Sequence, residues 1–303
     1  MKILDDTKIP EQPYPELRKV LQAFVEAVAA QLGENLVGIY LVGSLASGDF
    51  DLDSDVDFLV VTNNVVNEET MNSLQEIQVR IHALGCYPAQ HLEGSYISIS
   101  DLNDWDSVGE KKLYYFDNGS TTYEESTHDN QWHVRWVLRE CGITLVGPAP
   151  EKILKTIPLN ELLTEIKKTM NQALIDFQVE IHLPLSFLNS RFGQSFIVLT
   201  FCRMLHTLHT GTVQSKKAGA IWAGEFVDPK WVSFIEGAWQ EREGVRFMEK
   251  IGQRAQQTLL NETLEFIQYA VAQIDRAMVA NRFFSSHVRI QTDRGHTVIS
   301  AGP

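Results

Sequence analysis

Five aspartates lie within nine residues of this 303-residue chain, at positions 49, 51, 53, 55 and 57. The last two, Asp55 and Asp57, stand at the start of an apolar run, Val56 to Val61, that has the composition of a strand. Residues i and i+2 of a strand point to the same face, so we expect the two carboxylates to lie together. Because free charge is costly against an apolar strand, we predict that they hold a divalent cation.

A Gly43-Ser44 corner precedes the acidic segment and follows a short apolar run. Backbone N–H groups and a hydroxyl at such a corner suit a polyphosphate, and Mg²⁺ prefers a few carboxylates completed by phosphate oxygens and water. The combination predicts a site for a metal-bound nucleotide. The alternatives are a solvated acidic turn or a Ca²⁺ loop. An EF-hand, however, needs Gly and Glu where this chain has Ser54 and Val60.

The order Gly-Ser, ten residues, then Asp-Val-Asp resembles the signature of the DNA polymerase β-like nucleotidyltransferase superfamily. The resemblance implies that Gly43 and Ser44 hold the nucleotide phosphates and that Asp55 and Asp57 hold Mg²⁺. Ser54, next to this pair, joins the candidate nucleotide-binding residues.

Glu93 is the next acid that a sheet can bring back to the aspartate pair, because the segment from 89 to 100 alternates as a strand. In the aminoglycoside adenylyltransferase branch, which this chain resembles, a Glu on the corresponding strand lies by the metal and acts as catalytic base. The resemblance therefore makes Glu93 the candidate base and a third metal ligand. The alternative is an acid that points outward from the strand.

The remainder of the first 150 residues supplies elements around these groups. Apolar spacing predicts an amphipathic helix from Pro15 to Gly33 and a second helix from 68 to 84. An aromatic stretch, 101–123, is expected to be a long functional loop with a short strand. A helix is expected at 129–141. His128 and Asp129 would either cap its start or, in the case of Asp129, take part in nucleotide binding.

The second half reads as helices separated by short Gly- or Pro-containing turns, as in a helical bundle. The run from 197 to 223 resembles the C-terminal domain of spectinomycin and streptomycin adenylyltransferases. That likeness implies that Arg203 and Lys216 contact the ATP phosphates. The alternatives are an internal salt bridge for Arg203 and a solvated helix-start lysine for Lys216. The spacing of Cys202, His206 and His209 could put them on one helical face, as in a zinc site. A packed thiol with two surface imidazoles is the better explanation.

Bulk composition limits the partners. A formal charge of −13 argues against nucleic acid and favours a cationic acceptor. The three cysteines are widely separated, which predicts a reduced cytoplasmic protein. The N-terminus lacks a basic segment followed by an apolar core, and the sequence has no run of 18 apolar residues, so neither a signal peptide nor a membrane span is expected. The oligomeric state stays open between a monomer and an unknown oligomer.

These inferences converge on an α/β (α+β) nucleotidyltransferase domain with a mixed sheet at 1–150. An all-α helical bundle is expected at 151–280. The remaining residues, 281–303, are expected to form a tail that is either a hairpin or disordered. The resemblance implies AMP transfer from MgATP to a hydroxyl of a small cationic, aminoglycoside- or aminocyclitol-like acceptor held with the nucleotide between the domains. The alternatives are AMP transfer to a protein, as in an antitoxin, a nucleotide-binding sensor without catalysis, and an RNA nucleotidyltransferase.

The acceptor region departs from the family. Relatives that modify both spectinomycin and streptomycin carry a Trp and, five residues later, an Asp just before the second-domain helix that bears Arg203. Leu188 and Gly193 fall at about those places. The resemblance therefore implies weak or no transfer to streptomycin, because its guanidinium groups would lack an acidic partner. The natural acceptor is then a different aminocyclitol or an unrelated hydroxyl compound.

Overall fold

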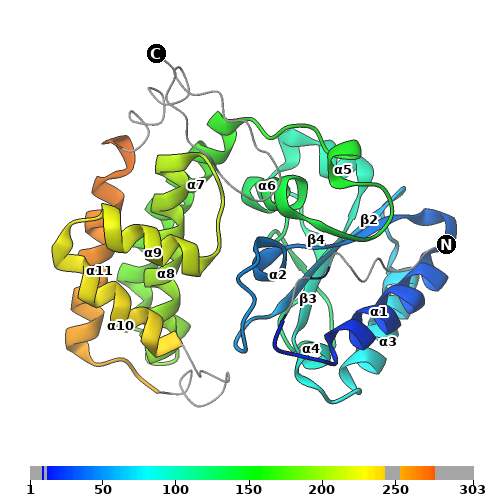
Figure 1. Cartoon of the computed structure of the whole chain (residues 1–303), viewed down its shortest axis with the longest axis horizontal. Helices are drawn as coiled ribbons and strands as arrows, with labels where there is room; N and C mark the ends of the chain where they lie inside the picture. The colour runs from blue at the N-terminus through cyan, green and yellow to red at the C-terminus, as the bar shows by residue number, and fades with distance from the viewer. Residues whose placement is uncertain (1–8, 10–11, 243–252, 277–303) are drawn as a thin grey trace. The chain divides into compact units, whose positions relative to one another are not determined.

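A computed structural model describes residue 9 and residues 12–242 and 253–276 (Figure 1). The chain divides into two compact units, Met1–Glu161 and Leu162–Pro303. The domain boundary that the sequence predicts near residue 150 precedes this division and stays a prediction. The predicted tail, 281–303, lies outside the described residues.

The first unit is built on a six-stranded mixed sheet with the order β5-β4-β3-β2-β1-β6. Strand β2 pairs antiparallel with β1 and parallel with β3, whereas every other pairing is antiparallel. The strands are β1 (Leu36–Leu41), β2 (Val56–Thr62), β3 (Leu92–Ser98), β4 (Leu113–Phe116), β5 (Glu124–Ser126) and β6 (Ile143–Val146). The predicted mixed sheet is therefore confirmed.

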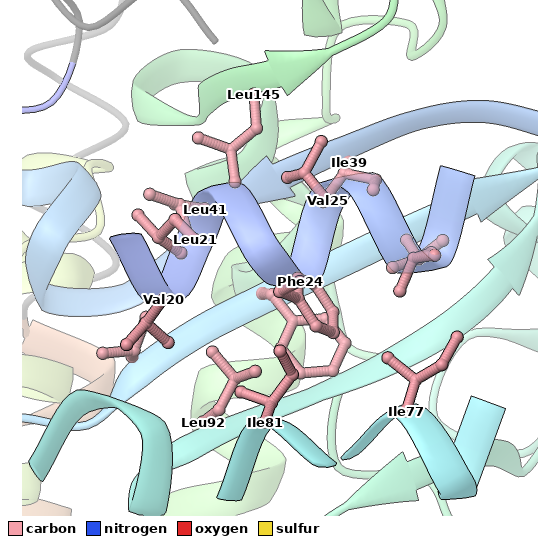
Figure 2. Packing of buried hydrophobic residues seen from close by; sticks show 14 of the residues in the cluster. Val20, Leu21, Phe24, Val25, Ile39, Leu41, Ile77, Ile81, Leu92 and Leu145 are labelled. Carbon is pink, nitrogen blue, oxygen red and sulfur yellow. The ribbon is translucent and has the colours of Figure 1, made fainter. Parts of the chain in front are cut away.

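Helices α1 (Leu17–Leu32) and α3 (Glu68–His82) form the apolar layer against the sheet. Figure 2 shows side chains from both helices meeting those of the strands in one cluster. Phe24 lies at its centre, with its ring centroid 4.8 Å from that of Phe58 on β2. Each fully buried side chain of this size contributes about 1.5 to 3 kcal/mol, so the layer holds β2 and β3 firmly in register.

The connection from β2 to β3 runs through α3, as a parallel pair requires. The strand expected over 89–100 is shorter than predicted, because α4 (Tyr87–Gln90) precedes β3 and α5 (Ile99–Asn103) follows it. Ser98 ends the strand by capping α5, since its hydroxyl accepts a hydrogen bond from the Asp101 N–H at 3.1 Å. The short helix α2 (Gly43–Ser47) forms the predicted Gly-Ser corner.

The helix expected at 129–141 is α6 (Trp132–Cys141), and its N-cap residue is Gln131. His128 and Asp129 therefore do not cap it, and the cap interpretation is wrong. The predicted aromatic loop contains β4 as its short strand, whereas β5 and β6 were not predicted. Three or four residues are too few for a periodic pattern to indicate a strand.

The described part of the second unit is helical, as predicted. Its helices are α7 (Leu159–Glu180, which begins in the first unit's last residues), α8 (Arg191–Thr210), α9 (Lys216–Phe226), α10 (Val232–Arg242) and α11 (Gln257–Ala272). Helix α8 is the buried centre of this unit. Helix α9 packs closely on it at Gly219, where a Cβ atom would lie 2.7 Å from the Arg203 Cα atom. In the described part of the chain, no helix is long and apolar enough to span a membrane.

Candidate active site

Asp57 and Glu93 lie opposite each other on the parallel strands β2 and β3, where their Cα atoms are register partners. Neighbouring strands are about 4.8 Å apart, so in-register side chains project from the same face side by side. Asp55 lies just before β2, in the acidic loop rather than in the strand as we expected. The fold thus brings the three predicted acids to one end of the paired strands.

Gly43 leaves room for this cluster. A Cβ atom at that position would lie 1.9 Å from Asp57 Oδ2, and its φ of +62° is one that other residues rarely adopt. The Asp57 carboxylate therefore lies directly against the Gly-Ser corner. The missing side chain explains why the corner needs glycine at this position.

The cluster raises the pKa values of its own acids. Burial is the main cause for Asp57, whose pKa lies well above the ordinary value, and the charges of Glu93, Asp55 and Asp129 add to the shift. Burial also raises the pKa of Glu93, although the hydrogen bond from Tyr115 opposes the change. Negative charge at this site is thus destabilised, and a cation bound there would relieve that strain.

His128 is the cationic side chain that these acids face. Its Nδ1 atom lies 3.1 Å from Asp129 Oδ1 and 3.9 Å from Glu93 Oε1. The hydrogen bond to Asp129 is the largest cause that raises the pKa of His128 to about 9, against the effect of burial. Ser95 of β3 donates a hydrogen bond to Asp129 Oδ2 at 2.7 Å and fixes the second carboxylate oxygen. Asp129 therefore belongs to the cluster.

Tyr115 of β4 is a site residue that the sequence analysis missed. Its hydroxyl donates to Glu93 Oε1 at 2.5 Å and lies 3.1 Å from Asp117 Oδ1. Its ring stacks on His128, with 4.9 Å between the centroids. The tyrosine-rich run at 114–115 was the available signal, but it indicates contact with Glu93 only once the pairing of β3 with β4 is known.

Asn118, which follows β4, was also missed. Its Nδ2 atom donates to Asp55 Oδ1 at 2.6 Å, and its Oδ1 atom lies 2.8 Å from His91 Nδ1. Two of the three predicted acids, Glu93 and Asp55, thus have a neutral donor from the segment that the sequence indicated only as an aromatic loop.

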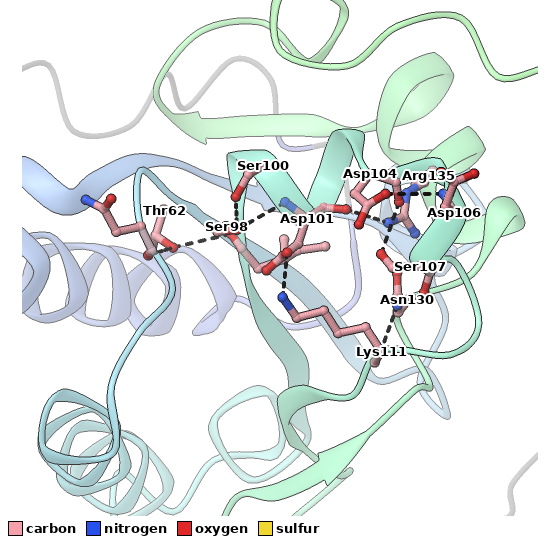
Figure 3. A network of polar contacts seen from close by, with 12 residues as sticks. Thr62, Ser98, Ser100, Asp101, Asp104, Asp106, Ser107, Lys111, Asn130 and Arg135 are labelled. Atoms are coloured by element: carbon pink, nitrogen blue, oxygen red, sulfur yellow. Dashed lines mark hydrogen bonds and ion pairs between the residues drawn. The ribbon is translucent and has the colours of Figure 1, made fainter.

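The segment that carries His128 and Asp129 is held by the polar network of Figure 3. Asn130 donates from Nδ2 to the carbonyl oxygens of Ser107 and Lys111 at 2.9 and 2.8 Å. Buried Arg135 of α6 donates from Nε and Nη2 to the carbonyl oxygens of Leu102 and Asp101 at 3.1 and 3.0 Å. These bonds fix much of the expected functional loop onto α6, so part of its role is structural.

The other predicted phosphate contacts have clear positions in this unit. Ser44 is half-buried in the first turn of α2. Ser54 is buried, and its hydroxyl donates to Asp51 Oδ1 at 2.8 Å while it accepts from the Asp51 N–H at 3.1 Å. Ser54 therefore shapes the acidic loop, and its role in nucleotide binding stays a prediction.

Arg203 and Lys216 lie in the second unit, on α8 and at the start of α9. The Lys216 Nζ atom lies 3.8 Å from the centre of the Phe196 ring, a cation–π contact. Their predicted phosphate contacts stay predictions. Cys202 is buried, as expected for a packed thiol, and the rings of His206 and His209 pack against Trp222.

The donor set fits Mg²⁺. Within the described residues, no three His, Cys, Asp or Glu side chains already form a metal cage. Mg²⁺ does not need one, because it is commonly held by one or two carboxylates and completed by phosphate oxygens and water. Asp55 and Asp57, with Glu93 in register, offer such carboxylates in a place where negative charge is disfavoured.

Known family models and proteins match this chain over most of its length. The family model described as "Nucleotidyltransferase domain" matches residues 18–105, and that described as "Aminoglycoside adenylyltransferase, C-terminal domain" matches residues 152–272. A spectinomycin 9-adenylyltransferase of Staphylococcus aureus is 27% identical over 81% of this chain and 88% of its own length. An aminoglycoside (3'') (9) adenylyltransferase of Shigella flexneri is 22% identical over 87% of this chain and 97% of its own.

The fold is also similar to that of a solved protein. The crystal structure of a spectinomycin adenyltransferase from Enterococcus faecialis, with ATP and spectinomycin, gives a TM-score of 0.61 at 16% identity. The match covers 85% of this chain and 99% of that one.

Replacing Gly43 tests the contact between the corner and the acid pair. Gly43→Ala should lose nearly all transfer activity, because the new Cβ would collide with the Asp57 carboxylate. Gly48→Ala is the matched control, since Gly48 also has a positive φ, +80°, but open space around its Cα. Gly48→Ala should lose about 1 to 2 kcal/mol in urea unfolding from backbone strain, and Gly43→Ala should lose more because the collision adds to that strain. Equal activities in the two variants would contradict the assigned contact.

Proposed function

We propose that this chain, which is an aminoglycoside adenylyltransferase-like nucleotidyltransferase, transfers AMP from MgATP to a hydroxyl group of an aminoglycoside-type acceptor. The observation that carries the proposal is the in-register pair of Asp57 and Glu93, with Asp55 beside it and the Gly43 corner against it. Two carboxylates to hold a metal and a third to accept a proton are what such a transfer needs.

The chain's own residues then have distinct tasks. Asp55 and Asp57 hold Mg²⁺, which when bound neutralises phosphate charge and orients the phosphates. Glu93 accepts the proton of the acceptor hydroxyl. The hydroxyl oxygen bonds to the α-phosphorus of ATP at the same time as the bond from that phosphorus to pyrophosphate breaks. Burial favours this role, because the raised pKa makes the Glu93 carboxylate a stronger base.

Tyr115 and His128 position this base. Tyr115 donates to Glu93 Oε1, which directs the other carboxylate oxygen away from it. We assign phosphate binding to Gly43 and Ser44, and nucleotide binding also to Ser54, Asp129, Arg203 and Lys216.

Three other functions make different predictions. A non-catalytic sensor would bind ATP without releasing pyrophosphate. An antitoxin-like enzyme would label a protein rather than a small molecule. An RNA nucleotidyltransferase would retain RNA in a filter-binding assay, which the formal charge of −13 disfavours.

The acceptor prediction separates spectinomycin from streptomycin. Gly193 is buried in the first turn of α8, where a Cβ atom would lie 2.0 Å from the Phe187 carbonyl oxygen. No acidic side chain fits there without moving the turn at 187–189. We therefore expect an AMP-sized mass gain on spectinomycin-type aminocyclitols, with kcat/KM for streptomycin lower by roughly ten- to a hundredfold, the value of one charge-assisted bond.

The measurement is mass spectrometry of both drugs incubated with protein and MgATP, followed by steady-state kinetics. Efficient transfer to streptomycin would mean that other residues supply the acidic contact. If pyrophosphate were released but no member of an aminocyclitol panel gained the mass of AMP, the acceptor would be a different kind of molecule.

Glu93→Gln tests the catalytic base. The variant should bind MgATP with nearly unchanged affinity in calorimetry but transfer AMP about 10²- to 10⁴-fold more slowly, because it removes a proton acceptor. Glu124→Gln, on the exposed edge strand β5, is the control and should match the wild type. Lost nucleotide binding in Glu93→Gln would instead make Glu93 chiefly a metal ligand.

A further inference from the structure

We propose that Asn118 is a positioning residue for Asp55, and that an aromatic stack of Tyr14, Tyr87 and His91 holds Asn118 in place. The inference rests on the proposed function, in which Asp55 binds the metal ion. It adds a set of residues, from three separate parts of the first unit, whose purpose is to orient one carboxylate.

Asp55 needs such help because of its position. Asp57 lies within β2, where it pairs with Glu93 of β3 and its carbonyl oxygen accepts a hydrogen bond from the Val42 N–H at 3.0 Å, and Gly43 packs against its carboxylate. Asp55 precedes the strand, so no ladder of hydrogen bonds fixes its side chain direction. A metal ligand on such a loop depends on side-chain partners for its orientation.

The direction of the hydrogen bonds follows from the chemistry. A carboxylate can only accept, so the nitrogen of the Asn118 amide must be the atom 2.6 Å from Asp55 Oδ1. The amide oxygen then faces His91 Nδ1 at 2.8 Å and requires a hydrogen on that nitrogen. A flipped amide would turn its oxygen toward the Asp55 carboxylate and its nitrogen toward the His91 Nδ1–H group, so both neighbours favour the observed orientation.

The stack fixes His91 in turn. The Tyr87 ring stacks on His91 with 4.0 Å between centroids, and Tyr14 stacks on Tyr87 at 4.8 Å. The Tyr14 hydroxyl donates to the Leu52 carbonyl oxygen at 2.5 Å, and the Val56 N–H donates to the His91 carbonyl oxygen at 2.9 Å. The two ends of the stack are therefore bonded to the two sides of Asp55 in the chain.

The proposal predicts a loss of metal affinity when Asn118 is replaced. Asn118→Ala should bind Mn²⁺, used as the probe, about 10- to 100-fold more weakly than the wild type, the usual effect of removing a partner of a metal ligand. The free Mn²⁺ concentration is measured by electron paramagnetic resonance in a titration of the full chain with ATP present, and the Mn²⁺ bound in a matched ATP solution without protein is subtracted. The Mg²⁺ concentration for half-maximal transfer should rise by the same factor, while kcat at saturating Mg²⁺ changes little.

Two further variants control this measurement. Asn72→Ala is the matched control, because it also removes an asparagine side chain that makes a hydrogen bond. Asn72 Oδ1 accepts from the hydroxyl of Tyr123, which follows β4, at 3.2 Å on an exposed surface. It should bind Mn²⁺ as the wild type does. His91→Phe keeps an aromatic ring against Tyr87 but removes the Nδ1 donor, so it should weaken binding in the same direction as Asn118→Ala and replaces that variant if the latter does not fold.

The outcomes separate this inference from the proposed function. Saturable Mn²⁺ binding by the wild type, with equal affinity in Asn118→Ala and Asn72→Ala, would overturn the positioning role while leaving the metal site. No saturable binding by the wild type would overturn the metal role of Asp55 and this inference with it.

Discussion

The enforced proximity of buried carboxylates is the constraint on which the first unit depends. Parallel pairing of β2 and β3 sets Asp57 and Glu93 side by side, and burial raises the pKa of both. Unpaired burial of charge is unfavourable, so the apolar layer under the strands has to hold them in register against that repulsion. Residues such as Phe24 and Phe58 supply this stabilisation from the side of the sheet that α1 covers.

The groups around the pair show two ways of moderating the same repulsion. His128 supplies a positive charge from outside the sheet, where Asp129 raises its pKa to about 9. Tyr115 and Asn118 supply neutral donors, one to Glu93 and the other to Asp55. His128 offsets the negative charge, whereas the hydrogen bonds from Tyr115 and Asn118 orient the carboxylates. Metal ligands need both effects, because they must lie close together and point toward the same position.

Local sequence patterns were sufficient to place Asp55 and Asp57 near each other and to predict most of the helices, whereas the choice of Glu93 came from the family resemblance. Asp55, Asp57 and Gly43 stand in one short segment, and α1 follows directly from its apolar spacing. Tyr115, Asn118 and His91 were missed because their roles depend on the register of β3 with β4, which no local pattern specifies. His128 and Asp129 were ambiguous for a different reason. Their residue types suit a helix cap, and only the observed start of α6 excludes that role.

We infer that the Asp57 carboxylate is destabilised until a cation binds beside it. Its folded-state pKa lies above that of the unfolded chain, so its contribution to stability is present at low pH and is lost as the pH rises through the folded value. The direct test is urea unfolding of the wild type and Asp57→Asn between pH 5 and 8, with and without Mg²⁺. Without Mg²⁺ the variant should be the more stable protein, by a margin that grows with pH, and Mg²⁺ should stabilise only the wild type. A variant that is less stable than the wild type without metal, or that gains as much from Mg²⁺, would contradict the account.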